Sequence, residues 1–221
     1  PRLFEPWVGA SPGGAGLGLY QARRVVLAGI GTGKAAAVRQ ALQPLAGAFT
    51  GTVKRAVVCF AGAADAGAVA AAVMAVSQVS YVYTATKPKA EARTLNRVVL
   101  GVEDTTAVAD AFARSVATAV GVELAREWGN RPANHATPAL LAAAAKELAK
   151  HPGVQCKVMG PADVAKLGMG AFMAVARGSH EELRFIELRY NGAAKSQPPV
   201  VLVGKGITFD TGGISIKPAA E

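Results

Sequence analysis

The sequence predicts an α/β fold with an N-terminal α/β domain, a long linking helix and the first part of a second α/β domain that has a mixed central sheet. Two patterns support this prediction. Aliphatic runs typical of strands alternate with helical segments between residues 25 and 102, and such alternation favours parallel strands joined by helical crossovers. Residues 105–128 then place apolar side chains at three- and four-residue steps, as one long amphipathic helix does. We therefore expect boundaries at 1–104, 105–130 and 131–221.

The composition is that of a globular chain with a substantial core. Of the 221 residues, 51% are hydrophobic and 18% are charged, which excludes an intrinsically disordered protein. The net charge is +9, and residues 1–104 hold 11 Lys and Arg against 5 Asp and Glu, whereas residues 105–221 hold 13 against 10. A basic N-terminal half permits an acidic partner such as nucleic acid. Its basic residues are scattered without interleaved aromatics, however, which favours a solvated surface.

The first domain is expected to begin irregularly, because residues 1–19 are rich in Gly and Pro. The run Gly29–Lys34 resembles a phosphate-binding loop, but alanine stands at its first glycine position and again after the lysine. We therefore expect a strand-to-helix turn there. Helices are expected at 35–46, with a distortion near Pro44, and at 65–76. Strands are expected at 25–28, 55–60, 79–83 and 97–102.

The second domain is expected to open with a helix. Thr137 and Pro138 form a strong helix start, because threonine caps a helix and proline fits its first turn. This helix should end near Lys150, and a strand at 154–159, a short helix at 161–167 and a strand at 182–190 should follow. The run Val200–Val203 has no polar residue, which is typical of a strand buried on both faces.

Other residues that could carry chemistry favour structural roles. Cys59 and Cys156 lie in apolar runs without metal-ligand spacing, so we expect buried free thiols in a reducing, cytoplasmic compartment. The 3 histidines share no i, i+4 pairing, and we expect them at the surface or at caps. The uncharged stretch 66–86 is rich in alanine, and we interpret it as a soluble helix and strand, not as a membrane span.

The glycine-rich run after Val203 holds the candidate site. Lys205, Asp210 and Lys217 are its charged side chains before Glu221, and glycines are spaced among them. In open α/β sheets, ligands bind beyond the carboxyl ends of strands, where this loop would lie. Two lysines and an aspartate in such a loop predict a functional site, although a turn with a solvated lysine is the ordinary alternative.

The same residues resemble a known family. The run Gly204-Lys-Gly-Ile-Thr-Phe-Asp-Thr-Gly-Gly-Ile-Ser-Ile-Lys-Pro218 is similar to the signature of the leucyl (cytosol) aminopeptidase family, and segments 130–138 and 167–179 are similar to family segments in the same order. The resemblance implies a two-metal exopeptidase that releases N-terminal amino acids from peptides. It implies that Lys205 and Asp210 are metal ligands, with Asp210 bridging both ions, and that Lys217 is catalytic.

The resemblance also implies two divalent metal ions (manganese or zinc), peptide substrates, a homo-hexamer and a cytoplasmic location. Some bacterial relatives bind DNA as architectural factors, so a DNA-binding protein of the same family, with or without peptidase activity, is the alternative hypothesis. A paralogue without catalysis is a third. Salt-dependent DNA binding that survives Lys217→Ala would favour the DNA-binding alternative, whereas loss of peptidase activity on the same substitution would favour the enzyme.

The chemistry of these side chains is compatible with the implied roles. A lysine ligates a cation only as a neutral amine, so metal binding must displace its proton. A carboxylate can bridge two ions about 3.5–4 Å apart, and a charged lysine can stabilise an oxyanion. One lysine and one aspartate do not complete the coordination of two ions, and the family's other carboxylates and its arginine have no match here. We therefore expect the chain, which begins at Pro1, to be a fragment that is inactive alone.

Overall fold

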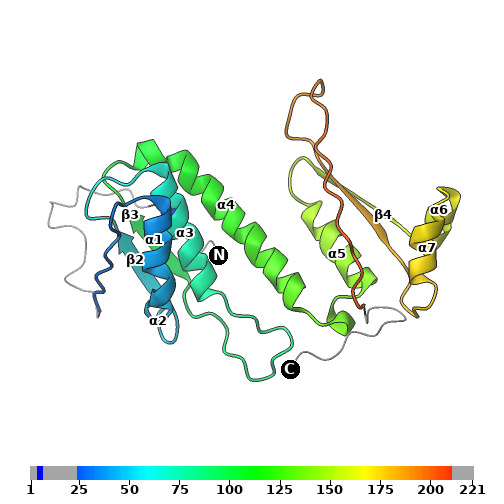
Figure 1. The fold of residues 1–221 in the computed structure, drawn as a ribbon, viewed down its shortest axis with the longest axis horizontal. Helices are drawn as coiled ribbons and strands as arrows, with labels where there is room; N and C mark the ends of the chain where they lie inside the picture. The colour runs from blue at the N-terminus through cyan, green and yellow to red at the C-terminus, as the bar shows by residue number, and fades with distance from the viewer. Residues whose placement is uncertain (1–3, 7–23, 211–221) are drawn as a thin grey trace. The chain divides into compact units, whose positions relative to one another are not determined.

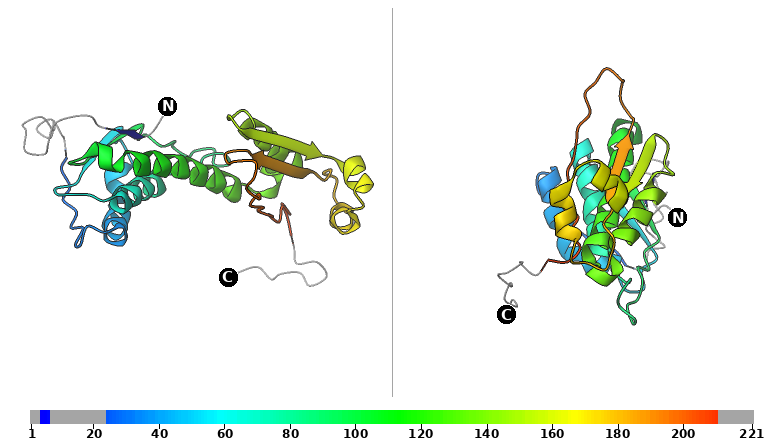
Figure 2. Two further views of the ribbon diagram at one scale, coloured as in Figure 1. Left: turned by 90° about the horizontal axis from the view of Figure 1, so that it is seen from above. Right: turned by 90° about the vertical axis from the view of Figure 1, so that its right-hand side faces the viewer.

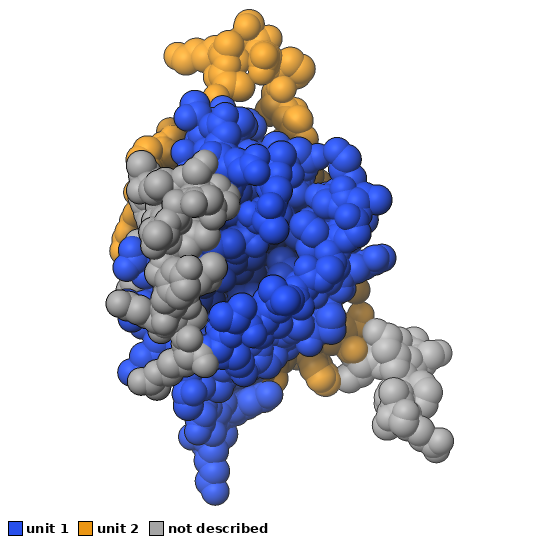
Figure 3. Space-filling view, turned by 90° about the vertical axis from the view of Figure 1, so that its left-hand side faces the viewer, with its two compact units in different colours: residues 1–130 blue, residues 131–221 orange. Residues whose placement is uncertain are grey.

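A computed structural model of the chain describes residues 4–6 and 24–210 (Figure 1, with two further views in Figure 2). The chain divides into two compact units, Pro1–Asn130 and Arg131–Glu221, which Figure 3 colours separately. Each unit combines helices with a small sheet, parallel in the first unit and antiparallel in the second. The α/β class expected from the sequence is therefore confirmed.

The first unit contains a parallel sheet in the order β1-β3-β2. Val98 and Leu100 of the central strand are buried, and they pair with Ala56 and Val58 of the neighbouring strand. Val57, which lies between those two residues, is 51% exposed. The alternation along the strand thus puts one face of the sheet on the core and the other toward solvent. The strands are β1 (Phe4–Pro6), β2 (Arg55–Cys59) and β3 (Arg97–Gly101).

The helices of the first unit begin after the glycine-rich turn at residues 29–34. Gly31 and Gly33 take left-handed φ angles of 50° and 69° there, so the expected turn into the helix is confirmed, although residues 25–28 before it do not form the expected strand. The distortion expected near Pro44 is a short 3-10 turn. Asp65 caps the third helix by accepting a hydrogen bond from the Ala68 N–H at 2.8 Å. The segments are α1 (Ala35–Leu42), η2 (Gln43–Leu45), α2 (Ala46–Phe49) and α3 (Ala66–Ser80).

The long predicted helix is present as α4 (Thr105–Asn130). Asp104 is its cap, because one carboxylate oxygen accepts hydrogen bonds from the N–H groups of Thr106 at 2.8 Å and Ala107 at 3.1 Å. The helix packs against α3, which also contacts α1 (Figure 1). The core of the first unit therefore forms where α3 meets its two neighbouring helices and the sheet.

The second unit pairs β4 (Val154–Met159) with β5 (Phe185–Tyr190), and α5 (Pro138–Leu148) contacts both strands. Thr137 accepts a hydrogen bond from the Leu140 N–H at 3.4 Å, so the predicted start of α5 is confirmed. Met159, Val164 and Leu183 form a small separate core. The remaining helices are η3 (Ala133–His135), α6 (Pro161–Lys166) and α7 (Gly170–Ala176), of which only α6 was expected.

Three expectations for the first unit are wrong. Residues 25–28 are irregular, and Leu27 is 93% exposed, because no ladder in the described part of the chain pairs with them. The strand expected at 79–83 does not form, because α3 continues to Ser80. Val79 packs on the core as a helical residue, so packing overrides the preference of valine for strands. Conversely, the Gly- and Pro-rich start holds β1, which pairing with β3 stabilises.

The buried strand predicted at Val200–Val203 is also wrong. These four side chains are between 72% and 92% exposed. A strand buried on both faces needs ladder partners and covering helices. Within residues 131–210, the ladder that forms joins β4 only to β5, and residues 200–203 remain without regular secondary structure.

The expectation of buried thiols is wrong as well, since Cys59 is exposed and Cys156 is half-buried. Cys59 lies on the same face of β2 as Val57, and this face of the sheet is toward solvent. The three histidines are exposed, as expected. No helix in the described ranges is long and apolar enough to cross a membrane.

Candidate functional site

The candidate loop lies at the end of the described chain. Residues 199–207 have no regular secondary structure, and a bend falls at Thr208. At Gly204 and Gly206, no heavy atom lies within 4 Å of the place a Cβ would occupy, and neither residue has a positive φ. Crowding and backbone strain therefore do not require glycine at these two positions.

Lys205 and Asp210 come together across this bend. The Lys205 Nζ lies 3.3 Å from the Asp210 Oδ2, and the two side chains are 70% and 37% exposed. Exposed ion pairs of this kind contribute only about 0–1 kcal/mol to folding, because water and salt screen them. The pair is therefore available for chemistry at little cost to the stability of the fold.

The two side chains fit a divalent cation as adjacent ligands. Donor atoms about 2.1 Å from one ion lie about 3.0–3.4 Å apart at right-angled or tetrahedral coordination, and the N···O distance here is 3.3 Å. Both groups are accessible, so a cation can reach them from solvent. Within the described residues there is no cluster of three or more His, Cys, Asp or Glu side chains that could hold a metal. The pair thus offers two donors of a larger coordination shell.

Lys217, the third residue of the predicted site, lies outside the described residues. The structure therefore brings together Lys205 and Asp210 and gives no position for Lys217. The catalytic role of Lys217 and the ligand roles of the other two remain predictions.

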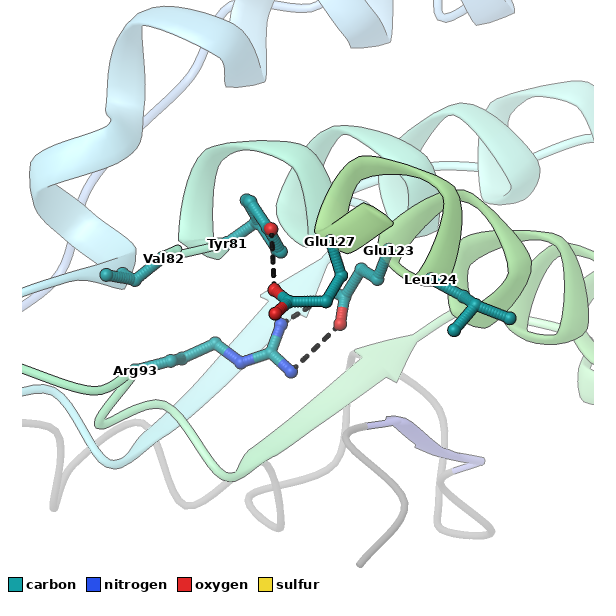
Figure 4. Close-up of a pocket in the computed structure, with 6 residues that line it drawn as sticks. All are labelled: Tyr81, Val82, Arg93, Glu123, Leu124 and Glu127. Atoms are coloured by element: carbon teal, nitrogen blue, oxygen red, sulfur yellow. Dashed lines mark hydrogen bonds and ion pairs between the residues drawn. The ribbon is translucent and has the colours of Figure 1, made fainter. Parts of the chain in front are cut away.

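A second polar cluster lies in the first unit and was not predicted from the sequence (Figure 4). It surrounds an open pocket of about 390 Å³ lined by Tyr81, Val82, Arg93, Glu123, Leu124 and Glu127. The two terminal nitrogens of Arg93 donate to the two carboxylate oxygens of Glu123 at 2.6 and 3.1 Å. The Tyr81 hydroxyl donates to Glu127 at 3.2 Å. One sequence signal could have indicated this cluster: the two glutamates are spaced i, i+4, which puts them on one face of α4.

Comparison with known proteins agrees with the signature in the loop. Residues 123–221 match the cytosol aminopeptidase family, catalytic domain. The chain is 67% identical over 201 residues to a probable cytosol aminopeptidase of Acidovorax ebreus (strain TPSY), which is 90% of this chain and 40% of that protein. The chain belongs to the cytosol aminopeptidase family. The resemblance drawn from residues 204–218 is therefore confirmed.

Further relatives of this family match over nearly the whole chain. The probable cytosol aminopeptidase of Verminephrobacter eiseniae (strain EF01-2) is 62% identical over 214 residues, which is 94% of this chain and 41% of that protein. The chain thus spans about 40% of the length of the curated relatives it matches. A solved structure, the bottromycin maturation enzyme BotP in complex with Mn, is 28% identical with a TM-score of 0.73, covering 99% of this chain and 50% of that one.

Proposed function

We propose that the protein is a metal-dependent leucyl-type aminopeptidase that removes N-terminal amino acids from peptides. The observation that carries this proposal is the 67% identity to a probable cytosol aminopeptidase over 90% of the chain. The amine and carboxylate 3.3 Å apart in the loop add support, because they fit adjacent positions on a cation. In this proposal, residues 131–221 form the first part of the catalytic domain, and residues 105–130 link it to the N-terminal domain at 1–104.

The proposed roles follow from the chemistry of each side chain. Lys205 would hold a divalent ion through a neutral amine after loss of its proton, and the Asp210 carboxylate would supply oxygen ligands beside it. Such ions, when bound, supply Lewis-acid polarisation of the scissile carbonyl and an activated water. Lys217 keeps its positive charge and stabilises the negative charge that develops on the carbonyl oxygen.

The nature of the metal and the assembly belong to the same proposal. Manganese is the first metal to test, because BotP was solved with Mn, and zinc is the second. A homo-hexamer and a cytoplasmic location rest on the family resemblance, and light scattering of the purified protein tests the hexamer. DNA binding has only the basic composition of residues 1–104 in its favour, and it stays an alternative hypothesis.

The test uses the protein as its gene encodes it, stripped with EDTA and reloaded with MnCl₂ or ZnCl₂. We expect hydrolysis of leucine 4-nitroanilide only after a metal is added. Lys217→Ala should lower kcat by about a hundredfold or more, as removal of an oxyanion-stabilising group does, while the bound metal is retained. Asp210→Asn should lower both activity and metal content.

Matched controls come from exposed residues that are not part of the loop, Lys195→Ala and Asp110→Asn, which should retain full activity and metal content. A folded parent protein that binds manganese or zinc and hydrolyses no peptide bond would contradict the proposal. So would full activity in Lys217→Ala.

A further inference from the structure

The chain contains one Asn-Gly pair, and it lies at the end of strand β5. Asn191 directly follows Tyr190, the last residue of that strand, and Gly192 comes next. Both residues are exposed, and residues 191–199 form bends and a turn without helix or strand. Figure 1 draws this segment as an orange loop that projects beyond the strand pair. Asparagine is one of the thermolabile residues of proteins, so its surroundings here decide whether it reacts.

The two groups that react when asparagine loses its amide are both accessible here. They are the side-chain carbonyl carbon of Asn191 and the backbone nitrogen of Gly192. Within the described residues, neither the Asn191 side chain nor the Gly192 N–H makes a hydrogen bond. The Asn191 N–H does donate to the Gly153 carbonyl, at 2.9 Å. This bond holds the backbone of residue 191 at the end of the ladder and leaves its side chain open to attack.

The packing of the Tyr190 ring favours glycine at position 192. A Cβ there would lie 2.6 Å from the Tyr190 hydroxyl oxygen and would overlap two carbons of the ring. A larger residue at position 192 must therefore displace the ring. Glycine has no Cβ, so nothing beside its nitrogen hinders the approach of that nitrogen to the neighbouring Asn191 side chain.

We propose that Asn191 is a site of spontaneous deamidation. The Gly192 nitrogen attacks the Asn191 side-chain carbonyl carbon, the bond from that carbon to its amide nitrogen breaks, and the proton of the Gly192 nitrogen leaves with the amide as ammonia. The product is a five-membered succinimide ring. One water then adds and breaks one of the two bonds between the ring nitrogen and a carbonyl carbon. Breakage on the side-chain carbon gives aspartate, and breakage on the backbone carbon gives isoaspartate.

The reaction changes the start of the segment that joins β5 to the candidate loop. Either product adds a negative charge at residue 191. Isoaspartate also lengthens the backbone by one carbon between residues 191 and 192, which moves Gly192 relative to the Tyr190 ring. The modification is therefore a chemical record of the age of the protein, and it is independent of the proposed peptidase function.

The other three asparagines are more restrained. Asn96 and Asn134 are each followed by a residue whose N–H already donates to a backbone carbonyl, at 3.3 and 2.8 Å. The side-chain amide of Asn130 donates to the Tyr81 hydroxyl at 3.4 Å. Each of the three precedes an arginine or a histidine, whose side chain hinders the attacking nitrogen. These three residues serve as internal references.

The test incubates the protein as its gene encodes it in mildly alkaline buffer and follows its tryptic peptides by mass spectrometry. We expect the peptide Tyr190–Lys195 to gain the mass difference between an amide and an acid. Deamidation at Asn191 should be at least about tenfold faster than at any other asparagine, a difference of about 1.4 kcal/mol in activation free energy. Methyl transfer to the same peptide by an isoaspartyl methyltransferase should confirm the isoaspartate.

Unfolding and substitution show whether the fold leaves this site open. In guanidinium chloride, the rate at Asn191 should change little, whereas the rates at the other asparagines should rise. Asn191→Gln should abolish the fast phase of ammonia release, because glutamine would have to close a larger ring. The matched control Asn134→Gln, also at an exposed position, should leave that phase unchanged. Circular dichroism checks that each variant is folded.

Equal rates at all four asparagines in the folded protein would overturn the proposal. So would a rate at Asn191 at least about tenfold lower in the folded than in the unfolded protein, because the fold would then protect this site. Neither result requires metal or a peptidase assay, so both are distinct from a failure of the proposed function.

Discussion

Asp210→Asn should separate metal binding from folding. The Lys205–Asp210 pair is 3.3 Å long, with side chains 70% and 37% exposed, so its loss should cost at most about 1 kcal/mol of unfolding free energy. In a chain of this size that is a fall in Tm of about 2–4 °C. The same substitution removes a charged ligand oxygen. Removing groups that only support metal ligands costs about 10- to 100-fold in affinity, so loss of the ligand itself should cost at least about 100-fold.

The two quantities are measured on one preparation. Thermal unfolding in EDTA gives the stability difference, and titration of the EDTA-free protein with MnCl₂ gives the affinity. Asp110→Asn, exposed on α4, is the matched control and should change neither. The reasoning is refuted if Asp210→Asn lowers the unfolding free energy of the metal-free protein by more than about 2 kcal/mol. It is also refuted if the Asp210→Asn variant binds manganese as tightly as the parent protein.

Three further predictions concern the fold. Gly101→Ala should lower the free energy of unfolding by about 1–3 kcal/mol, because the added Cβ would lie 2.9 Å from the Cys59 Sγ. Adding Cys59→Ala should restore most of that loss, as measured by urea unfolding. If the effects of the two substitutions are independent, the contact is disproved. Asp104→Ala should lower the free energy of unfolding by about 1 kcal/mol and speed amide hydrogen exchange in the first turn of α4, because it removes the carboxylate that accepts hydrogen bonds from two N–H groups there. Unchanged exchange in that turn would show that Asp104 does not cap the helix. The hydrogen bond from Lys34 holds the pKa of Asp65 below its ordinary value, so the Asp65 carboxylate stabilises the fold at pH values above that ordinary pKa and this stabilisation is lost as the pH falls below it. Asp65→Asn should therefore make Tm fall less steeply below about pH 4. An unchanged slope of Tm against pH would contradict this prediction.

Most of the longer helices of this chain could be predicted from the sequence because their signals are local. Asp104 and Thr137 each cap a helix through backbone N–H groups two or three residues away, so a short window contains the whole interaction. Pro44 likewise acts on its own turn. The apolar periodicity of α4 is a property of one segment, and the helix forms where that periodicity places it.

The strands predicted at 55–60, 97–102, 154–159 and 182–190 are present as β2 to β5. The other strand predictions failed because a strand depends on a partner far away in sequence. β1 forms in a Gly- and Pro-rich segment, since Phe4 lies beside Val98 of β3. The more strand-like run at Val200–Val203 remains exposed, because no described strand pairs with it. Residue preference indicates where a strand can form, whereas the ladder decides where it does.

The two candidate sites differ in the same way. Lys205 and Asp210 are five residues apart and carry a family signature, so one loop was enough to predict them, and the structure brings them into contact. The pocket takes Tyr81 and Arg93 from either end of a long connection and Glu123 from α4. No sequence pattern links those segments, and only the packing of α3 against α4 brings them together.

The most direct test of the central claim is the position of the metal. Crystals of the protein as its gene encodes it, grown with MnCl₂, should show anomalous density for manganese in contact with both the Lys205 Nζ and the Asp210 carboxylate, at ligand distances of about 2.0–2.4 Å. Manganese bound elsewhere in an active preparation, with Lys205 and Asp210 still paired to each other, would contradict the account.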